Sequence, residues 1–302
     1  MGPRQHNEHS TLMQTKQQIQ QLLASAGISP NKRLGQHFLI DLNLIRMLVN
    51  SAHINNNDIV LEVGCGTGSL TEALAECAGK VIAVELDQTL AKIAKRQLAK
   101  AENVEVIDAD ILENKNTISR TVADTLQLCQ KEYSGRILLV TNLPYNVASP
   151  VMLNLITGPT KADSMYVTVQ KEVAQRMTAS PGSSDYGTLS IFLGATGDAK
   201  IIRILKPTVF WPQPQVNSAM VSFIRRNDKV SRIHSMEFLG EVVHLFMQHR
   251  RKTLKACTKF ATGKLAEIHN WGEIFKQCSI DPTLRPEQLS PENYIAIANL
   301  CQ

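Results

Sequence analysis

The chain has 302 residues, of which 43% are hydrophobic and 20% are charged, and its formal net charge is +5. This globular composition suits one large α/β domain plus a smaller one. No stretch approaches the roughly 20 apolar residues that cross a bilayer, and the polar N-terminal segment lacks the apolar part of a secretory signal, so a membrane protein and a secreted protein are excluded. The 6 cysteines are scattered without a C-x-x-C pair, which argues against disulfides and against a metal site and predicts a cytoplasmic protein.

Residues 1–30 are expected to be an N-terminal extension. The pattern over 13–26 predicts a helix that ends before Gly27 and Pro30, because both residues interrupt helices. Residues 1–12 are polar and are expected to be disordered.

Strand-like and helix-like patterns alternate along the next two hundred residues. Strands are expected at 59–63, 81–85, 104–108, 137–141, 166–170, 201–205 and 219–224. Helices are expected at 70–76, 87–100, 171–179 and within the polar segment 113–135. Such alternation predicts an α/β domain with a mostly parallel, doubly wound sheet, which we place at 31–227.

The strand pattern ends after Arg226, and apolar residues then recur at helical spacing over 238–246. We therefore expect a helical C-terminal domain at 228–302. From Val242 to Ala266 there is no acidic residue, and residues 9–40 also lack acids. Acid-free basic segments attract polyanions, although a solvated helix face is the alternative interpretation. The candidate RNA-binding residues are Lys32, Arg33, Arg250, Arg251, Lys252 and Lys255.

A glycine-rich turn, 64–68, follows the first strand and opens a helix. Its glycines permit a tight turn and close approach of the backbone to a ligand, although a structural turn is the alternative. Glu85 ends the second strand, where a carboxylate can accept hydrogen bonds from ribose hydroxyls, and Asp110 follows the third, where it can meet an adenine amino group. The E-x-G-x-G-x-G spacing differs from that of NAD enzymes, so S-adenosyl-L-methionine is favoured over NAD as cofactor.

The fourth strand runs into Asn142-Leu143-Pro144-Tyr145, a sequence that suits methylation of an amino group. The amine of adenine is a poor nucleophile, and the Asn142 side-chain oxygen and the Leu143 carbonyl can hold its protons. Pro144 restrains that carbonyl, and Tyr145 offers a face for base stacking. Phe210 could close the other face of a flipped base, or it could be a hydrophobic plug. Catalysis then consists of positioning and electrostatics, without a strong general base.

These residues belong to an ordered series of motifs that resembles the ribosomal RNA adenine dimethylase family, of the KsgA type that acts on small-subunit RNA. The series begins with KRLGQHFL at 32–39 and includes the features above. Its further members are 170–176, 181–187, 210–219, 250–254 and 289–291.

The resemblance implies a class I S-adenosylmethionine-dependent methyltransferase, with a Rossmann-like sheet of seven strands and a helical C-terminal domain. It implies two methyl additions to each of two neighbouring adenines near the 3′ end of small-subunit rRNA, within a pre-30S-type particle, and we expect a monomer. The cofactor contacts that it implies are Gln36, His37, Leu39, Gly64, Gly66, Glu85, Leu86, Asp110, Ile111 and Asn142. Around the target base it places Asn142, Leu143, Tyr145 and Phe210. Without the resemblance, His37 would be interpreted as structural.

Two alternatives share this core. One is a large-subunit rRNA adenine methylase, and the other is a nucleic-acid-binding transcription or assembly factor. The motifs at 250–254 and 289–291 favour the small-subunit enzyme, and the intact sequence at 142–145 argues against a protein that only binds.

Overall fold

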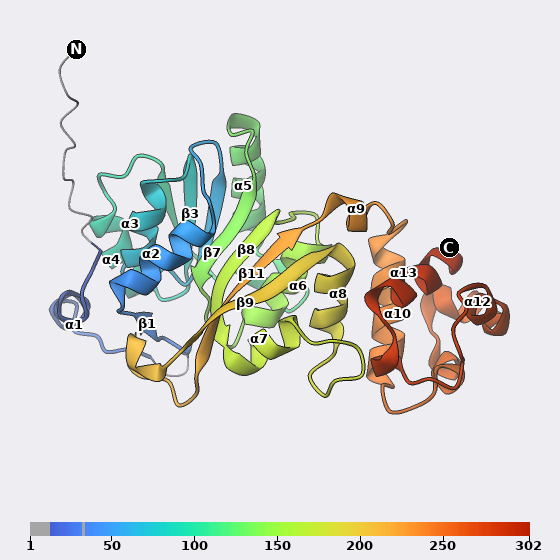
Figure 1. Ribbon diagram of the computed structural model, residues 1–302. Coiled ribbons are helices and arrows are strands. Elements are labelled where there is room, and N and C mark those ends of the chain that lie inside the picture. The colour runs from blue at the N-terminus through green and yellow to red at the C-terminus, as the bar shows by residue number, and fades with distance from the viewer. Residues whose placement is uncertain (1–12, 32–33) are drawn as a thin grey trace, which may run out of the picture. The chain divides into compact units, whose positions relative to one another are not determined.

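The computed structural model describes residues 13–31 and 34–302 (Figure 1). The chain forms two compact units. Unit 1 comprises Met1–Asn114, Ile118–Asn146 and Lys206–Gln215, and unit 2 comprises Lys115–Thr117, Val147–Leu205 and Val216–Gln302. The expected disorder of 1–12 and the candidate residues Lys32 and Arg33 lie outside the described residues.

Four parallel strands form the centre of unit 1. They are β2 (Ile59–Val63), β3 (Lys80–Glu85), β4 (Val104–Asp108) and β7 (Ile137–Asn142), in the spatial order β4-β3-β2-β7. Every residue of β2 is buried, as expected for a strand that is covered on both faces of its sheet. The complete order of the seven strands is β4-β3-β2-β7-β8-β11-β9, which confirms the expected Rossmann-like α/β class.

The helices of unit 1 are α1 (Lys16–Ser25), α2 (Leu42–Ser51), α3 (Ser69–Ala75), α4 (Gln88–Gln97) and α5 (Arg120–Glu132). Within the same unit, β1 (Phe38–Leu39) pairs with β10 (Phe210–Trp211) as a short antiparallel ladder. The polar segment that was expected to hold a helix also contains a hairpin, β5 (Leu112–Asn114) and β6 (Thr117–Ile118).

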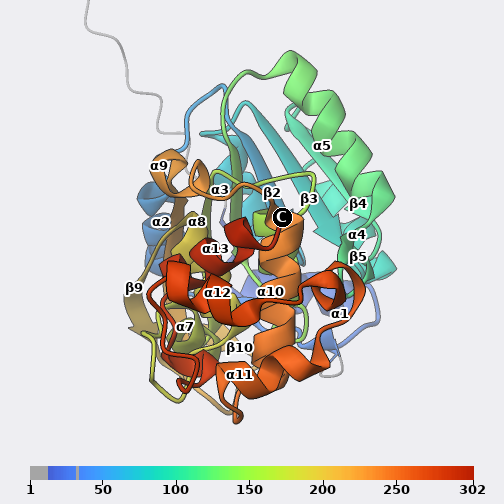
Figure 2. The same ribbon diagram turned by 90° about the vertical axis from the view of Figure 1, so that its right-hand side faces the viewer.

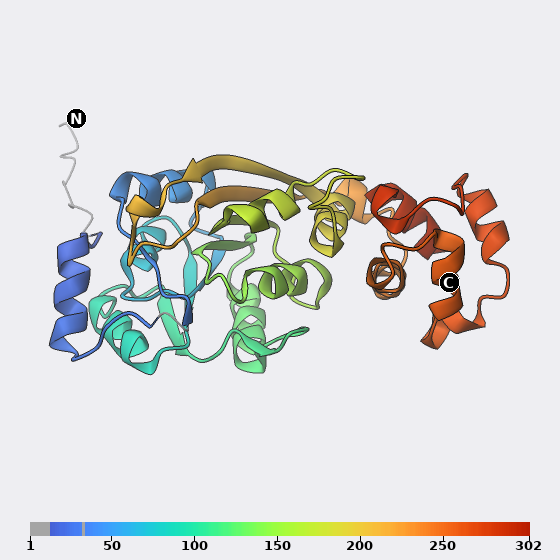
Figure 3. The same ribbon diagram turned by 90° about the horizontal axis from the view of Figure 1, so that it is seen from below.

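The expected N-terminal helix is present as α1, which is the blue helix nearest the N-terminus in Figure 3. Ile19 and Leu23 are buried in one cluster with Leu90 and Ile93 of α4. Just before α1, the buried side chain of Gln14 donates a hydrogen bond to the carbonyl of Thr67, at 3.0 Å. The segment 14–23 therefore packs against the rest of unit 1 and reaches the glycine-rich turn.

A buried ion pair joins the beginnings of β2 and β7. Asp58 is fully buried, and one of its carboxylate oxygens lies 2.6 Å from Nη2 of Arg136. The other oxygen accepts a hydrogen bond from the backbone N–H of Arg136 at 2.9 Å. Because each residue immediately precedes its strand, the pair aligns the two strands in register, with Ile59 opposite Ile137.

Unit 2 contains the remaining strands, β8 (Ser164–Gln170), β9 (Gly197–Leu205) and β11 (Ser218–Arg225). β11 runs antiparallel to both β8 and β9. The mostly parallel sheet expected from the sequence therefore has an antiparallel end, because 206–217 contain no α-helix to carry the chain across the sheet. The helices that accompany these strands are α6 (Ala148–Thr157), α7 (Lys171–Met177), α8 (Thr188–Thr196) and α9 (Asn227–Val230).

The C-terminal part of unit 2 is helical, and Figure 2 shows its helices in orange and red. They are α10 (Met236–Gln248), α11 (Leu254–Cys257), α12 (Trp271–Gln277) and α13 (Pro291–Leu300), with the short turns η3 (Thr258–Phe260), η4 (Gly263–Glu267) and η5 (Pro286–Gln288). Phe246 of α10 lies at the centre of their core, with its ring 6.1 Å from that of Trp271 and 6.3 Å from that of Tyr294. The expected boundary near residue 228 stays a prediction. No helix within the described ranges is both long and apolar enough to span a membrane.

Candidate active site

The glycines of the turn at 64–68 allow two other segments of unit 1, around Phe38 and Pro144, to pack closely against it. Gly64 and Gly66 both have positive φ, 77° and 59°, a conformation that side chains disfavour. A Cβ atom on Gly64 would lie 2.7 Å from Cγ of Pro144, and one on Gly66 would lie 2.9 Å from the ring of Phe38. The absence of side chains at 64 and 66 therefore permits the close approach of the 38 and 144 segments.

The carboxylate of Glu85 is held against this turn. Its Oε2 accepts a hydrogen bond from the backbone N–H of Gly66 at 2.8 Å, and its Oε1 accepts one from the N–H of Asp87 at 2.9 Å. Burial raises the pKa of Glu85, and the two N–H donors act in the opposite direction. The acid expected to bind ribose is thus fixed in place by the backbone of the same turn.

The candidate residues Leu86, Asp110 and Ile111 follow the ends of strands β3 and β4, and their side chains differ in exposure. Leu86 is 48% exposed, which leaves an apolar side chain available beside Glu85. Asp110 is exposed and one of its oxygens accepts the backbone N–H of Leu112 at 2.9 Å, whereas Ile111 is buried.

The segment that precedes β1 is tied to the same strand end. Gln36 donates from Nε2 to Asp87 at 3.2 Å, and its Oε1 accepts the backbone N–H of Asn31 at 2.7 Å. Asp87 also caps α4, since its carboxylate accepts the N–H of Thr89 at 3.0 Å. Asp87 was not among the expected site residues; the signal in the sequence was an acid at the residue before a helix.

His37 brings three segments of unit 1 together. Its Nδ1 lies 2.6 Å from the carbonyl oxygen of Pro212, so this nitrogen carries the proton and donates. Its ring stacks on Tyr145, with centroids 5.5 Å apart and planes inclined by 29°. Its own carbonyl accepts a hydrogen bond from Nδ2 of Asn142 at 2.7 Å. The histidine expected to line the cofactor pocket is thus also a structural link among candidate catalytic residues.

The bond from Asn142 to His37 sets the orientation of the Asn142 amide. With Nδ2 turned to the His37 carbonyl, Oδ1 is the acceptor end of the side chain. Leu143 is buried and Pro144 packs at Gly64, so the backbone of this loop is held on both sides.

Phe210 is only 1% exposed and lies opposite Leu39 in the β1–β10 ladder. Its burial agrees with the interpretation as a hydrophobic plug. Contact of Phe210 with a flipped base stays a prediction, as does contact of Leu39 with the cofactor.

A second buried carboxylate, that of Glu62 just before the glycine-rich turn, was not among the expected site residues. Glu62 lies in β2 and is 2% exposed. Burial, together with the nearby Glu85 carboxylate, raises the pKa of Glu62 to about 8. The signal in the sequence was a glutamate inside an otherwise apolar strand, IVLEV.

The candidate RNA-binding residues of unit 2 differ in their surroundings. Arg250 forms an ion pair with Glu287, with 3.0 Å between Nη2 and Oε2, and also donates to the Ser184 carbonyl. Arg251, Lys252 and Lys255 are exposed. Arg250 therefore contributes to the internal structure of unit 2, whereas the other three side chains face solvent.

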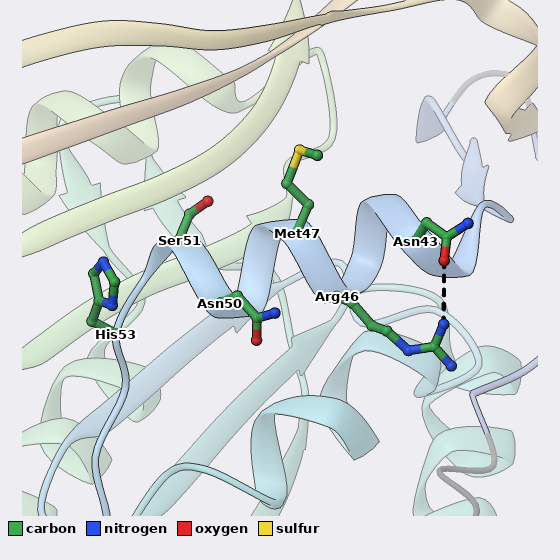
Figure 4. Close-up of a pocket in the computed structure, with 6 residues that line it drawn as sticks. All are labelled: Asn43, Arg46, Met47, Asn50, Ser51 and His53. Atoms are coloured by element: carbon green, nitrogen blue, oxygen red, sulfur yellow. Dashed lines mark hydrogen bonds between the residues drawn. The ribbon is translucent and has the colours of Figure 1, made fainter.

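A depression of about 540 Å³ lies over α2 (Figure 4). Its lining residues all come from this helix and the turn after it: Asn43, Arg46, Met47, Asn50, Ser51 and His53. None of them is a candidate site residue, and the one interaction drawn joins Arg46 to Asn43. We assign no ligand to it.

The residues of unit 1 fit S-adenosylmethionine. A fixed carboxylate at Glu85 and an exposed apolar side chain at Leu86 are suited to a cofactor that carries a nucleoside. Beside them, Asn142 and Tyr145 supply a hydrogen-bond acceptor and an aromatic face for a base.

Comparison with known proteins gives a consistent result. The model of the family described as ribosomal RNA adenine dimethylase matches residues 27–301. A protein from Geobacillus sp. named ribosomal RNA small subunit methyltransferase A is 35% identical over 292 residues, covering 95% of this chain and 97% of its own. A protein of the same name from Alkaliphilus oremlandii is 37% identical over 272 residues, with 89% and 91% covered.

Solved structures support the fold. A dimethyladenosine transferase from Plasmodium falciparum superimposes with a TM-score of 0.66 at 22% identity, covering 85% of this chain and 94% of that one. The 23S rRNA methyltransferase ErmE gives a TM-score of 0.60 at 21% identity, with 87% and 98% covered. The family match and the identity of the relatives go beyond a shared fold: this chain belongs to the ribosomal RNA adenine dimethylase family.

Proposed function

We propose that the protein uses S-adenosylmethionine to dimethylate the N6 amines of two adjacent adenines near the 3′ end of small-subunit rRNA. The relatives at about 35% identity are named as small-subunit rRNA methyltransferases, which supports this substrate over large-subunit rRNA. We further propose that the protein acts as a monomer on a pre-30S-type particle in the cytoplasm, with a role in assembly of the small subunit.

The chemistry follows from the residues at the ends of β2, β3 and β7. The bound cofactor supplies an electrophilic methyl group on a sulfonium. Glu85 and the glycine-rich turn bind and orient its nucleoside. Oδ1 of Asn142 and the Leu143 carbonyl accept hydrogen bonds from the adenine amine and hold its lone pair in line with the methyl group. Tyr145 stacks on the base, and the amine loses its proton after transfer.

The hydrogen bond from Asn142 to the His37 carbonyl carries this proposal. An amide with a free choice of orientation would present its N–H₂ to the adenine amine about as readily as its oxygen, and two donors cannot bond to each other. The His37 carbonyl fixes the orientation of the amide. A carbonyl oxygen can only accept a hydrogen bond, so it must face the N–H₂ of Asn142 and not the oxygen.

The test is Asn142→Ala, with Asn50→Ala on the exposed face of α2 as control. We expect Asn142→Ala to lower kcat by about 100-fold or more, as removal of one fixed polar group from an active site does, while binding of the small subunit remains. Methylation is measured by transfer of labelled methyl groups to subunits that lack the modification. Near-normal turnover by Asn142→Ala would contradict the mechanism, and the control is expected to retain wild-type kcat.

A further inference from the structure

One aromatic side chain of the helical part is about half exposed. Phe260 ends η3 and is 45% exposed, and every other phenylalanine, tyrosine and tryptophan in the described ranges is less exposed. Single exposed apolar side chains are common on protein surfaces, so the exposure of Phe260 alone does not require a partner. Its neighbours decide what the ring can bind.

The ring of Phe260 is held by two neighbours. The imidazole of His249, at the end of α10, stacks on it with centroids 4.1 Å apart and planes inclined by 26°. The ammonium of Lys252 lies over it, 5.4 Å from the centroid. Phe260 is therefore held between a stacked imidazole and a neighbouring cation.

The chain segment that contains this ring is basic. Phe260 lies in the segment from Val242 to Ala266, which contains no acidic residue. Lys252, Lys255 and Lys259 are exposed near it in the chain. A further lysine of the segment, Lys264, forms an ion pair with Glu237 at 2.9 Å and lies over the ring of Phe238.

We propose that Phe260 and His249 form a stacking platform for an unpaired nucleotide of the RNA substrate. A base that stacks on the Phe260 ring displaces the Lys252 ammonium from it, and that ammonium can then pair with a phosphate of the same RNA. Base stacking on aromatic rings combined with basic side chains on the backbone is the general way in which proteins hold single-stranded RNA. The platform rests on the proposed function, since it assumes that this protein binds rRNA.

The alternative occupant is an apolar segment of a protein partner. The composition of the segment favours RNA, because its four exposed cations Arg251, Lys252, Lys255 and Lys259 gain most from phosphates, whose counterions are released on binding.

The chain offers a matched pair for the test. Phe260→Leu removes the aromatic face in basic surroundings, and Phe238→Leu removes a ring that also has a lysine over it, but next to Glu237. Binding is measured with small ribosomal subunits that lack the modification and with a 12-nucleotide single-stranded RNA. We expect Phe260→Leu to raise the dissociation constant for both by about fivefold or more, and Phe238→Leu to leave both unchanged. Thermal unfolding verifies that each variant is folded.

A substitution that keeps an aromatic ring supplies the second readout. Phe260→Trp is expected to bind the RNA like the wild type, and its additional fluorescence is expected to be quenched by the 12-nucleotide RNA as the indole stacks on a base. Unchanged RNA binding by Phe260→Leu overturns the proposal. Weaker binding of subunits without any effect on the oligonucleotide, and without quenching, also overturns it and assigns the ring to a protein partner.

Turnover separates this proposal from the proposed function. At saturating subunit, Phe260→Leu is expected to methylate with the kcat of the wild type and a raised KM, since the platform lies outside the chemical site. If the wild type itself fails to methylate small subunits, the proposed function is wrong, whatever the effect of Phe260→Leu on RNA binding.

Discussion

His37 links several candidate site residues of unit 1. Its imidazole donates to the Pro212 carbonyl and stacks on Tyr145, and its carbonyl orients Asn142. The ring thus connects the loop after β10 with the loop after β7. Loss of the ring removes the hydrogen bond and the stacking contact but leaves the backbone carbonyl in the chain.

We expect His37→Ala to lower kcat by about 10- to 100-fold, since small misplacement of reacting groups has effects of this size, with a smaller change in KM for the RNA. His37→Asn is expected to restore part of the loss, because its amide can donate to the Pro212 carbonyl but cannot stack on Tyr145. Steady-state methylation of small subunits gives both constants. Equal kcat for His37→Ala and for the exposed control His269→Ala would show that this link does not position the site.

Within unit 2, the motifs at 181–187, 250–254 and 289–291 lie close together and are linked by hydrogen bonds and an ion pair. Arg250 pairs with Glu287 of η5, whose carbonyl accepts the backbone N–H of Gly182 at 2.7 Å. The hydroxyl of Tyr186 donates to the carbonyl of Leu289 at 2.8 Å. These motifs therefore hold the loop before α8 and the turns before α13 together, so part of the basic motif at 250–254 has a structural function.

We expect the adjacent residues Arg250 and Arg251 to have different roles, one in stability and the other in RNA binding. Arg250→Met is expected to lower the free energy of unfolding by about 1 kcal/mol, because it breaks a partly exposed ion pair with Glu287. Arg251→Met is expected to leave that free energy unchanged, and to weaken subunit binding and reduce its salt dependence by about one counterion. Urea unfolding and binding titrations at several salt concentrations measure the two effects. The assignment fails if both variants lose stability equally or if only Arg250→Met alters the salt dependence.

The buried acid Glu62 makes the free energy of unfolding of the whole molecule depend on pH. Glu62 has a pKa of about 8, because burial disfavours its charged form and Glu85 is close, compared with an ordinary 4.5 in the unfolded chain. Between these values the folded protein keeps a proton that the unfolded chain has lost. The stabilising contribution of the neutral carboxyl is therefore complete below pH 4.5 and is lost progressively as the pH rises to about 8.

Glu62→Gln keeps the shape of the neutral acid and removes its titration. Without cofactor, the variant and the wild type are expected to have similar free energies of unfolding near pH 5. Towards pH 8 the variant becomes relatively more stable, by at most about 1.4 kcal/mol per pH unit. Urea unfolding across this range measures the difference, and the exposed Glu102→Gln controls for the loss of a carboxyl. A difference that is constant with pH would mean that Glu62 is ionised throughout.

The sequence predicted elements best where the local pattern is strong and unambiguous. β2 and β4 begin and end where expected, because continuous apolar runs bounded by turns specify buried strands. Helices α2, α6 and α8 were missed. In the case of α8 the reason is that the helix is buried nearly all around, so its apolar residues show no helical period. The β1–β10 pair was missed because its two-residue strands are defined by a partner about 170 positions away.

By itself, the sequence determined the family, the Rossmann-like sheet and the cofactor class. The reason is that the glycine-rich turn, the acids at strand ends and the 142–145 motif are short local features that can be recognised from the order of residues alone. Only the tertiary structure decided that His37 orients Asn142, that Arg250 is engaged by Glu287 and that Glu62 is fully buried. The physical reason is that hydrogen-bond partners and desolvation depend on residues that are distant in the chain, and no pattern within one segment encodes them.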